Sequence, residues 1–461
     1  MSGHKMINRR RFLQSLMMAA ASPATSVADQ KYDAAVGPLR PDPGRLLDLP
    51  EGFNYRVVSR AGDTMTDGLQ VPRAHDGMAA FAGDDGRVVL VCNHEMPPTK
   101  LEYSAFGTSF SDLPDAVKER VYDHGSGTSP GAGGTTTTIY NPANGDIERQ
   151  HLSLAGTEIN CAGGPTPWGS WLSCEECFEQ PGTSFMSGRV VTRDEPHGYV
   201  FEVPANETGL VEPLPIEAMG RFEHEACAVH EASGIVYMTE DRYHSLFYRY
   251  IPKVPGQLLE GGRLQALAIV GQPSLQTHNW SSDHALETGN ALATHWIDLS
   301  DVNPAENNLR LRGAAAGAAT FARGEGLCLA DDEFVFTCTI GGPQRLGQVF
   351  SYRPSPVEGQ NGENAEPGQL TLIAESTHES LLRNADNIMM APWGDLVVCE
   401  DTASHCGLVG IRPDGSQYHL ADNAYSNSEL AGACFSPDGR TLFVNIQYPG
   451  TTIAITGPWP D

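Results

Sequence analysis

The chain has 461 residues, of which 40% are hydrophobic, and this is enough to bury a large core. Its 57 acidic residues outnumber the 30 basic ones and give a formal net charge of -27 at pH 7. This charge argues against nucleic acid and anionic membranes as partners, and it is compatible with cation binding.

The first residues resemble a twin-arginine export signal. Residues 9–13 read Arg-Arg-Arg-Phe-Leu, a weakly apolar segment follows, and residues 26–28, Ser-Val-Ala, offer a cleavage site. We therefore predict a signal peptide over residues 1–28 that is recognised by the twin-arginine translocation machinery, and a periplasmic or secreted protein. No run of about 18 apolar residues follows, so we expect no membrane span and a single domain over residues 29–461.

The rest of the chain has the pattern of strands, turns and loops with few helices. Residues 29–50, rich in Pro and Asp, are expected to form an extended arm that leads to a first strand near residues 55–59. The segment that starts with the strand-like residues 135–140 predicts a hairpin. The Ala-rich residues 314–323 are the best helix candidate, and residues 357–368 should form a surface loop.

Six stretches repeat one pattern, in which a short apolar run, usually led by Gly or Trp-Gly, ends on a polar or acidic residue. They are residues 86–95, 168–176, 234–241, 332–339, 393–401 and 439–447. The pattern within each copy is constant while the spacing between copies varies, as in a β-propeller with loop insertions. The repeat therefore predicts an all-β propeller with a few short helices.

Four of these runs follow another polar residue at a constant interval. The pairs are Cys161 with Glu175, Glu225 with Glu240, Glu325 with Thr339, and Asp386 with Glu400. Two short strands joined by a tight turn cover such an interval, and an antiparallel hairpin returns the chain to the end where it began. In a closed propeller these ends meet near the central channel, so we predict that the polar residues gather there.

The residues expected at this channel are mainly carboxylates: Glu95, Asn160, Cys161, Glu175, Glu176, Glu225, Glu240, Asp241, Glu325, Asp386, Glu400 and Asp401, with His75, His94, His224 and Arg323 nearby. Carboxylates cannot share a low-dielectric channel without cations, because each like charge raises the cost of ionisation. Oxygen ligands suit Ca²⁺, and a thiolate such as Cys161 among them suits a transition metal such as iron. The pattern therefore favours a mixed metal cluster.

Several of these residues have a second interpretation. The three histidines are equally compatible with hydrogen-bonded structural roles. Arg323 either neutralises neighbouring carboxylates or binds a phosphate oxyanion. Among the ten cysteines, those in apolar runs act by default as small hydrophobic residues, and the CxxC spacing of Cys174 and Cys177 does not by itself specify a zinc or redox role.

Longer motifs resemble the PhoX family of exported alkaline phosphatases. The residues that carry the resemblance are 93–95, 160–176, 220–225, 237–242, 392–401, 431–439 and 457–459, so they span nearly the whole mature chain. The resemblance implies a six-bladed propeller, a cofactor of two iron ions and several calcium ions, and hydrolysis of small phosphomonoesters. We also expect a monomer.

The resemblance further implies individual roles. Cys161 would bridge two irons with Glu95, Glu176 and Glu225 as further ligands, while Glu325, Asp386 and Glu400 would bind calcium or lie beside it. Arg323 would hold the phosphate. The full set of candidate metal ligands is Glu95, Asn160, Cys161, Glu175, Glu176, Glu225, Glu240, Glu325, Asp386 and Glu400, and the candidate catalytic residues are Arg323, Glu325 and Cys161.

Two other functions would also use a propeller with an acidic channel. One is a calcium-dependent lactonase or esterase, which needs no thiolate ligand. The other is a binding protein without catalytic activity, whose metals are structural and whose faces bind a partner.

Overall fold

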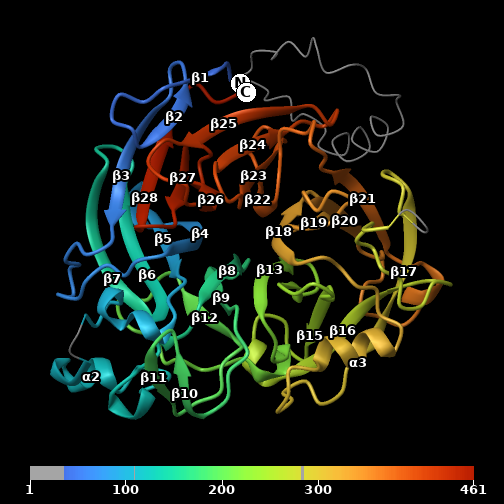
Figure 1. Ribbon diagram of the computed structural model, residues 1–461, viewed down its shortest axis with the longest axis horizontal. Coiled ribbons are helices and arrows are strands. Elements are labelled where there is room, and N and C mark those ends of the chain that lie inside the picture. Colours follow the sequence, from blue (N-terminus) through green and yellow to red (C-terminus); the bar gives the residue numbers. More distant parts are fainter. Residues whose placement is uncertain (1–35, 108–109, 282–284, 461) are drawn as a thin grey trace.

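The computed structural model of the protein describes residues 36–107, 110–281 and 285–460. The signal peptide predicted for residues 1–28 lies outside the described residues. In the described part, β-sheets are arranged in a ring around a common centre (Figure 1). No helix of that part is long and apolar enough to cross a membrane.

Six inner strands face the centre of the ring. They are β4 (His75–Ala82), β8 (Asn160–Pro165), β13 (His224–His230), β18 (Gly324–Ala330), β22 (Ala385–Met390) and β26 (Leu430–Phe435). Each contacts the next around the circle, and β26 contacts β4. The ring is therefore closed.

The second strands are the apolar runs predicted from the sequence. They are β5 (Val88–His94), β9 (Ser170–Glu175), β14 (Ile235–Glu240), β19 (Glu333–Cys338), β23 (Leu396–Glu400) and β27 (Thr441–Ile446). Each pairs antiparallel with the inner strand that precedes it. The predicted series of hairpins is confirmed.

The remaining strands extend these hairpins outward, except for Gly182–Met186 and Arg189–Arg193, which form a separate two-stranded sheet. They are β1 (Leu39–Arg40), β2 (Leu47–Pro50), β3 (Asn54–Arg60), β6 (Gly133–Asn141), β7 (Asp146–Thr157), β10 (Gly182–Met186), β11 (Arg189–Arg193), β12 (Val200–Pro204), β15 (Tyr248–Pro252), β16 (Gly262–Ile269), β17 (Ala291–Asp298), β20 (Gln348–Arg353), β21 (Gln369–Glu375), β24 (Gly407–Ile411), β25 (Gln417–Asn423) and β28 (Thr451–Thr456). The hairpin predicted after residue 135 is β6 and β7. The first strand predicted near residues 55–59 is β3.

The sheet topology is propeller-like, as the repeat predicts. The hydrogen-bonded sheets do not separate into equal blades, because β17 joins β16 to β21 and merges two groups into one nine-stranded sheet. The N-terminal β3 pairs with the C-terminal β28, so both ends of the chain contribute to one four-stranded sheet. This pairing ties the start of the ring to its end.

Helices are few and short. Within residues 36–107, 110–281 and 285–460 they are α2 (Asp115–Lys118) and α3 (Leu309–Ala315), together with short 3-10 turns. The helix predicted for residues 314–323 is therefore mostly wrong, because α3 starts before this range and includes only its first two residues. Beyond it, Thr320 and Phe321 make β-bridges with Gln276 and Ser245, and this tertiary pairing outweighs the helix propensity of the alanines.

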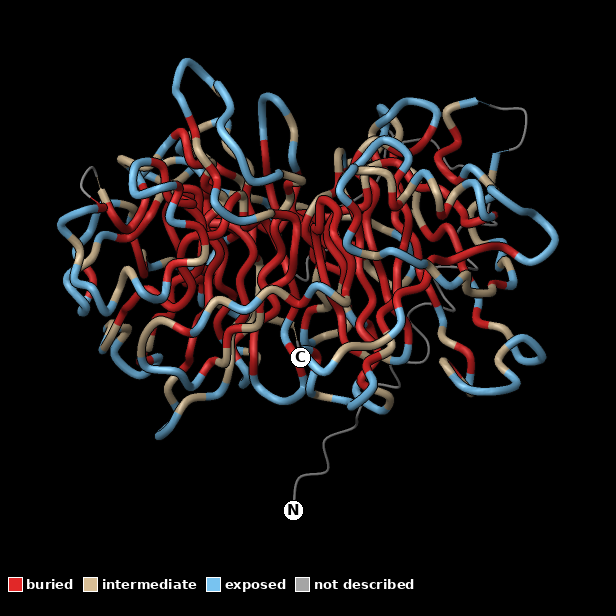
Figure 2. The backbone as a smooth tube through the Cα atoms, turned by 90° about the horizontal axis from the view of Figure 1, so that it is seen from below, coloured by how far each residue is buried: buried red, intermediate tan, exposed pale blue. Residues whose placement is uncertain are grey.

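The core lies between the sheets. Viewed from the side, buried segments form the middle layer of the molecule, and exposed loops project above and below it (Figure 2). Whole strands are buried, such as β14 with the sequence Ile-Val-Tyr-Met-Thr-Glu. This layer holds the ends of the inner strands in a fixed arrangement.

Candidate metal centre

The inner strands share the same backbone features at their first residues. The residue before four of them has a left-handed backbone, with φ of 49° at Ala74, 50° at Ile159, 57° at Arg323 and 47° at Asn384. A bulge then interrupts the pairing near the start of each of the six inner strands. Bulges re-aim side chains at the end of a strand, and here the second residues of the strands come close to one another.

In five of the six strands the second residue is polar: Asp76, Cys161, Glu225, Glu325 and Asp386. The residues that directly follow the second strands add Glu95, Glu176, Asp241 and Asp401, and Glu429 precedes β26. The prediction that polar residues from distant parts of the sequence meet at one end of the hairpins is therefore supported by the positions of these side chains.

Three groups of these side chains have their ligand atoms within 4.8 Å of one another. The first is Cys161, Glu176 and Glu225, the second is Asp76, Glu95 and Glu429, and the third is Glu225, Glu325 and Asp386. Because Glu225 belongs to both the first and the third group, these two groups are continuous.

The electrostatics of this acidic cluster are unfavourable without cations. Burial, together with the charges of neighbouring carboxylates, raises the pKa of Asp76 to about 7 and that of Asp386 to about 8. The same causes raise the pKa of Glu225 and Glu325 well above the ordinary range. These groups therefore bind protons near neutral pH unless a cation replaces them.

Arg323 is the cation that lies among these acids. Its Nε and Nη2 atoms donate to the two carboxylate oxygens of Asp241, each at 2.7 Å, and Nη2 also lies 2.9 Å from Glu325. Two carboxylates thus already share the charge of this guanidinium. It cannot neutralise the rest of the cluster.

Glycines allow the inner strands to approach closely just beyond the cluster. A Cβ added at Gly77 would lie 2.5 Å from the Cα of Ala162, and one added at Gly326 would lie 2.6 Å from the carbonyl oxygen of Asp386. Both distances are shorter than any real Cβ contact, so neither position can carry a side chain. Further along the strands lies a cavity of about 490 Å³ that Met78, Cys328 and other apolar side chains line.

Some predicted ligands make hydrogen bonds elsewhere. Glu175 accepts from His197 and from the backbone N–H groups of Glu158, Gly198 and Tyr199. Glu240 accepts from the Tyr248 hydroxyl, and Glu400 from the backbone N–H groups of Arg383 and Gly407. The Asn160 amide lies between Thr157 and Ser173. None of these four belongs to the three groups of the cluster.

The histidines also bond outside the cluster. His75 contacts Thr452 and the Pro72 carbonyl, His94 contacts Thr136 and the Arg73 carbonyl, and His224 contacts the Gly220 carbonyl. Burial lowers the pKa of His75 to about 4 and that of His224 to about 3. These contacts favour the structural interpretation of the three histidines.

Two members of the cluster, Asp76 and Glu429, were not found by the sequence reasoning. Asp76 follows His75 as Glu225 follows His224, and this parallel could have found it. More residues separate Asp76 from Glu95 than separate the corresponding cluster residues of the other hairpins, because β4 and β5 are long. Glu429 lies outside the repeated positions, and the sequence carries no signal for it.

The donor set fits both kinds of cation expected from the sequence. The second and third groups contain only carboxylates, which suit hard ions such as Ca²⁺. The first contains the buried thiol of Cys161, whose pKa burial and neighbouring acids raise. A thiolate at this position therefore requires a cation, and sulfur together with oxygen suits a transition metal.

Comparisons with known proteins identify a family and a similar fold. The family model described as alkaline phosphatase PhoX matches residues 34–450. Pseudomonas fluorescens PhoX, solved in complex with vanadate, a transition state analogue, is similar with a TM-score of 0.67 and 18% identity, covering 92% of this chain and 98% of that chain. This similarity establishes a shared fold.

More distant structures also match. A gluconolactonase from Xanthomonas campestris has a TM-score of 0.39 and 10% identity over 92% of this chain and 98% of its own. Virginiamycin B lyase from Staphylococcus aureus has a TM-score of 0.36 and 12% identity over 88% of this chain and 99% of its own. A search of curated proteins found no match.

Proposed function

The chain belongs to the alkaline phosphatase PhoX family and is a phosphoric monoester hydrolase, and on this premise we propose that the acidic cluster binds the metals for this reaction. The observation that carries the proposal is the grouping of Cys161 with Glu176 and Glu225, and of further buried carboxylates in two more such groups at the same end of the hairpins. Buried acids with raised pKa values in such an arrangement are candidates for a functional site.

We propose that the fold is a six-bladed propeller. The support is that six inner strands contact one another in a closed circle and that all six carry a bulge near the same end. In this description β17 is an extra strand that bridges the outer edges of two neighbouring blades.

The metals are proposed to be iron and calcium. Cys161, Glu176 and Glu225 would hold iron, because this group alone among the three contains sulfur. The carboxylate groups around Asp76 and around Glu325 would hold calcium. When bound, these ions supply the Lewis acidity that polarises a phosphoryl group.

Arg323 is proposed to hold the phosphate of the substrate. Its Nε and Nη2 atoms bond Asp241, which fixes the plane of the guanidinium. Within the described residues, Nη1 has no hydrogen-bond partner, so it is available to a phosphate oxygen. A planar guanidinium suits this contact because it can hold an oxyanion in one orientation.

Export and assembly are proposed on the sequence. The arginine run and the small-residue cleavage site at residues 9–28 support recognition by the twin-arginine machinery and a periplasmic or secreted location. A ring closed by β3 and β28 of the same chain supports a monomer. Small phosphomonoesters are the proposed substrates.

Turnover of p-nitrophenyl phosphate by the purified protein tests the proposed function. We expect hydrolysis that is lost on removal of metals with a chelator and recovered when calcium and iron are returned. Full turnover after complete removal of metal would contradict the proposal, because the residues of the chain would then suffice.

A further inference from the structure

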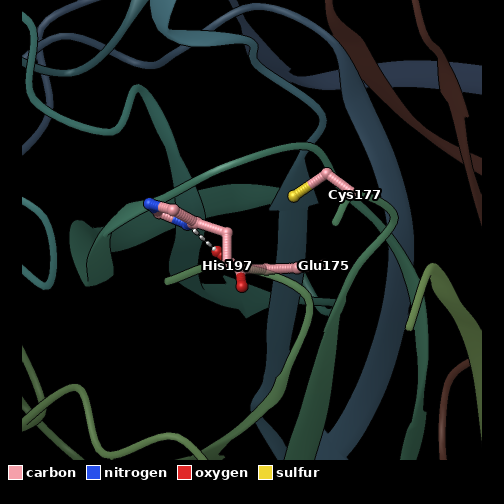
Figure 3. A group of neighbouring side chains, drawn as sticks. All are labelled: Glu175, Cys177 and His197. Atoms are coloured by element: carbon pink, nitrogen blue, oxygen red, sulfur yellow. Dashed lines mark hydrogen bonds and ion pairs between the residues drawn. The ribbon is translucent and has the colours of Figure 1, made fainter. Parts of the chain in front are cut away.

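A second buried charged network lies beside the acidic cluster. His197 is fully buried, with its Nδ1 atom 2.6 Å from Glu175 and its Nε2 atom 3.0 Å from Asp123. Arg193 donates from Nε and Nη2 to the two oxygens of Glu158, each at 2.8 Å. We call these five residues the His197 network. Figure 3 shows the contact between His197 and Glu175, with Cys177 nearby.

The His197 network is already satisfied without a metal ion. Glu175 accepts four hydrogen bonds, from His197 and from three backbone N–H groups, so little of its oxygen surface is free for a cation. Asp123 also accepts from the backbone N–H groups of Gly125 and Asp194. Although Glu175, Cys177 and His197 are close enough to hold an ion, their bonding favours a purely protein network.

His197 faces acids on both sides. Burial opposes its charged form, but the charges of Glu175 and Glu158 and the hydrogen bond with Asp123 raise the pKa of His197 to about 10. Both ring nitrogens can then donate, one to each carboxylate. Removing this donor leaves two buried carboxylates with only their backbone N–H donors and without a cationic partner, which destabilises far more than removal of an exposed pair.

The network connects the two backbone segments that carry Cys161 and Glu176. The Oε1 atom of Glu175 accepts from the backbone N–H of Glu158, at 2.9 Å. Next along the chain, the backbone N–H of Glu176 donates to the carbonyl of Ile159, also at 2.9 Å. Ile159 has the left-handed backbone that starts β8, so its placement decides where the thiol of Cys161 lies.

We propose that His197 is a positioning residue of the metal centre, which acts through Glu175 to fix Cys161 and Glu176 relative to each other. This inference rests on the proposed function, because it assigns His197 a role in metal binding at that same site. His197 itself does not touch the metal. Partners that orient metal ligands in this way typically contribute about 10–100-fold to metal affinity.

Two substitutions at residue 197 separate its two hydrogen bonds. Asparagine places an amide nitrogen near the position of Nδ1 and can still donate to Glu175, whereas glutamine places it near Nε2 and can still donate to Asp123. We expect His197→Gln to weaken iron binding by about 10–100-fold and to reduce any iron-thiolate absorption band. We expect His197→Asn to keep both near the wild-type level.

The control is Glu358→Gln. Glu358 is also buried and pairs with Arg249, but it bonds Tyr237 of β14 and Tyr352 of β20 and belongs to none of the three groups of the cluster. This variant is expected to lower the melting temperature and to leave iron content unchanged.

Glu175→Gln tests the hydrogen bond between His197 and Glu175 by changing the acceptor. The new amide NH2 group would face N–H donors in place of a carboxylate oxygen. We therefore expect this variant to lose iron as His197→Gln does.

The outcomes distinguish this inference from the proposed function. Iron per chain, the absorption band and the melting temperature are measured for each soluble variant. The positioning role is wrong if His197→Gln, or Glu175→Gln in its place, binds iron as tightly as the wild type. It is also wrong if Glu358→Gln, at a similar loss of melting temperature, loses as much iron as His197→Gln. If the wild type itself binds no metal, the proposed function fails together with the inference.

Discussion

Arg323 and Asp241 form a bidentate ion pair in which each oxygen of the carboxylate accepts one N–H group at 2.7 Å. Asp241 directly follows β14 and Arg323 directly precedes β18, so the pair joins neighbouring hairpins. The φ of Arg323 is 57°, a strained value for a residue with a side chain. Such strain is tolerated where the surroundings impose it, and here Asp241 holds the side chain of the strained residue.

Replacement of Arg323 by lysine should impair phosphoester hydrolysis. One ammonium group cannot bond both oxygens of Asp241 and also present a planar donor to phosphate. By analogy with the loss of one oxyanion donor, we expect kcat to fall by about 10²–10³-fold. Steady-state kinetics on p-nitrophenyl phosphate measure this.

Arg353→Lys is the matched control, because Arg353 of β20 pairs with Glu333 at the start of β19, which is the end away from the cluster. It should leave kcat unchanged. A value for Arg323→Lys within about twofold of the wild type would show that Arg323 only neutralises its neighbours, since a compact ammonium can do that equally well.

Glu176 and Glu400 should respond differently to replacement by glutamine. Glu176 lies in the group with Cys161, so Glu176→Gln should lower bound metal and activity together. Glu400 accepts from two backbone N–H groups, so Glu400→Gln should reduce the melting temperature and leave metal content near that of the wild type. Elemental analysis and thermal unfolding distinguish the two effects, and equal metal loss in both variants would contradict the assignment.

The stability of the metal-free protein should fall as the pH rises. The pKa of Asp76 is about 7 and that of Asp386 about 8 in the folded state, against about 4 for an exposed Asp. The folded state therefore binds more protons between these values, and raising the pH through this window removes stability. Bound metal replaces the protons, so the metal-loaded protein should lose less.

Thermal unfolding between pH 5 and 8.5, with and without chelator, checks this linkage. We expect the melting temperatures of the two forms to diverge as the pH rises. Parallel curves would mean that the acidic cluster does not exchange protons for metal.

The hairpins and the site could be predicted from the sequence to different extents. The second strands carry a repeated apolar pattern, and every one of them was located. The sequence does not show which acid at the end of a second strand belongs to the cluster. Glu175 and Glu176, for example, are adjacent, and successive side chains of a strand point to opposite sides. The sequence shows two acids, and the structure places Glu176 in the cluster and Glu175 in the His197 network.

Other parts of the site depend on tertiary packing. Asp123 and Arg193 reach the His197 network from a loop and from the hairpin of β10 and β11, far from the repeated runs. The bulges that bring the second residues of the inner strands together have no pattern in the sequence. Only the short residues beyond them, such as Gly77 and Gly326, hint at the close approach of neighbouring strands.

The central claim is that Cys161 and the surrounding carboxylates hold the metals of a phosphatase. Elemental analysis of the purified wild type and of Cys161→Ser, with p-nitrophenyl phosphate turnover on the same samples, tests it most directly. We expect iron and calcium with turnover in the wild type, and loss of iron and turnover in a variant that still folds. Iron and turnover retained in Cys161→Ser, or calcium without iron or turnover in the wild type, would contradict the claim.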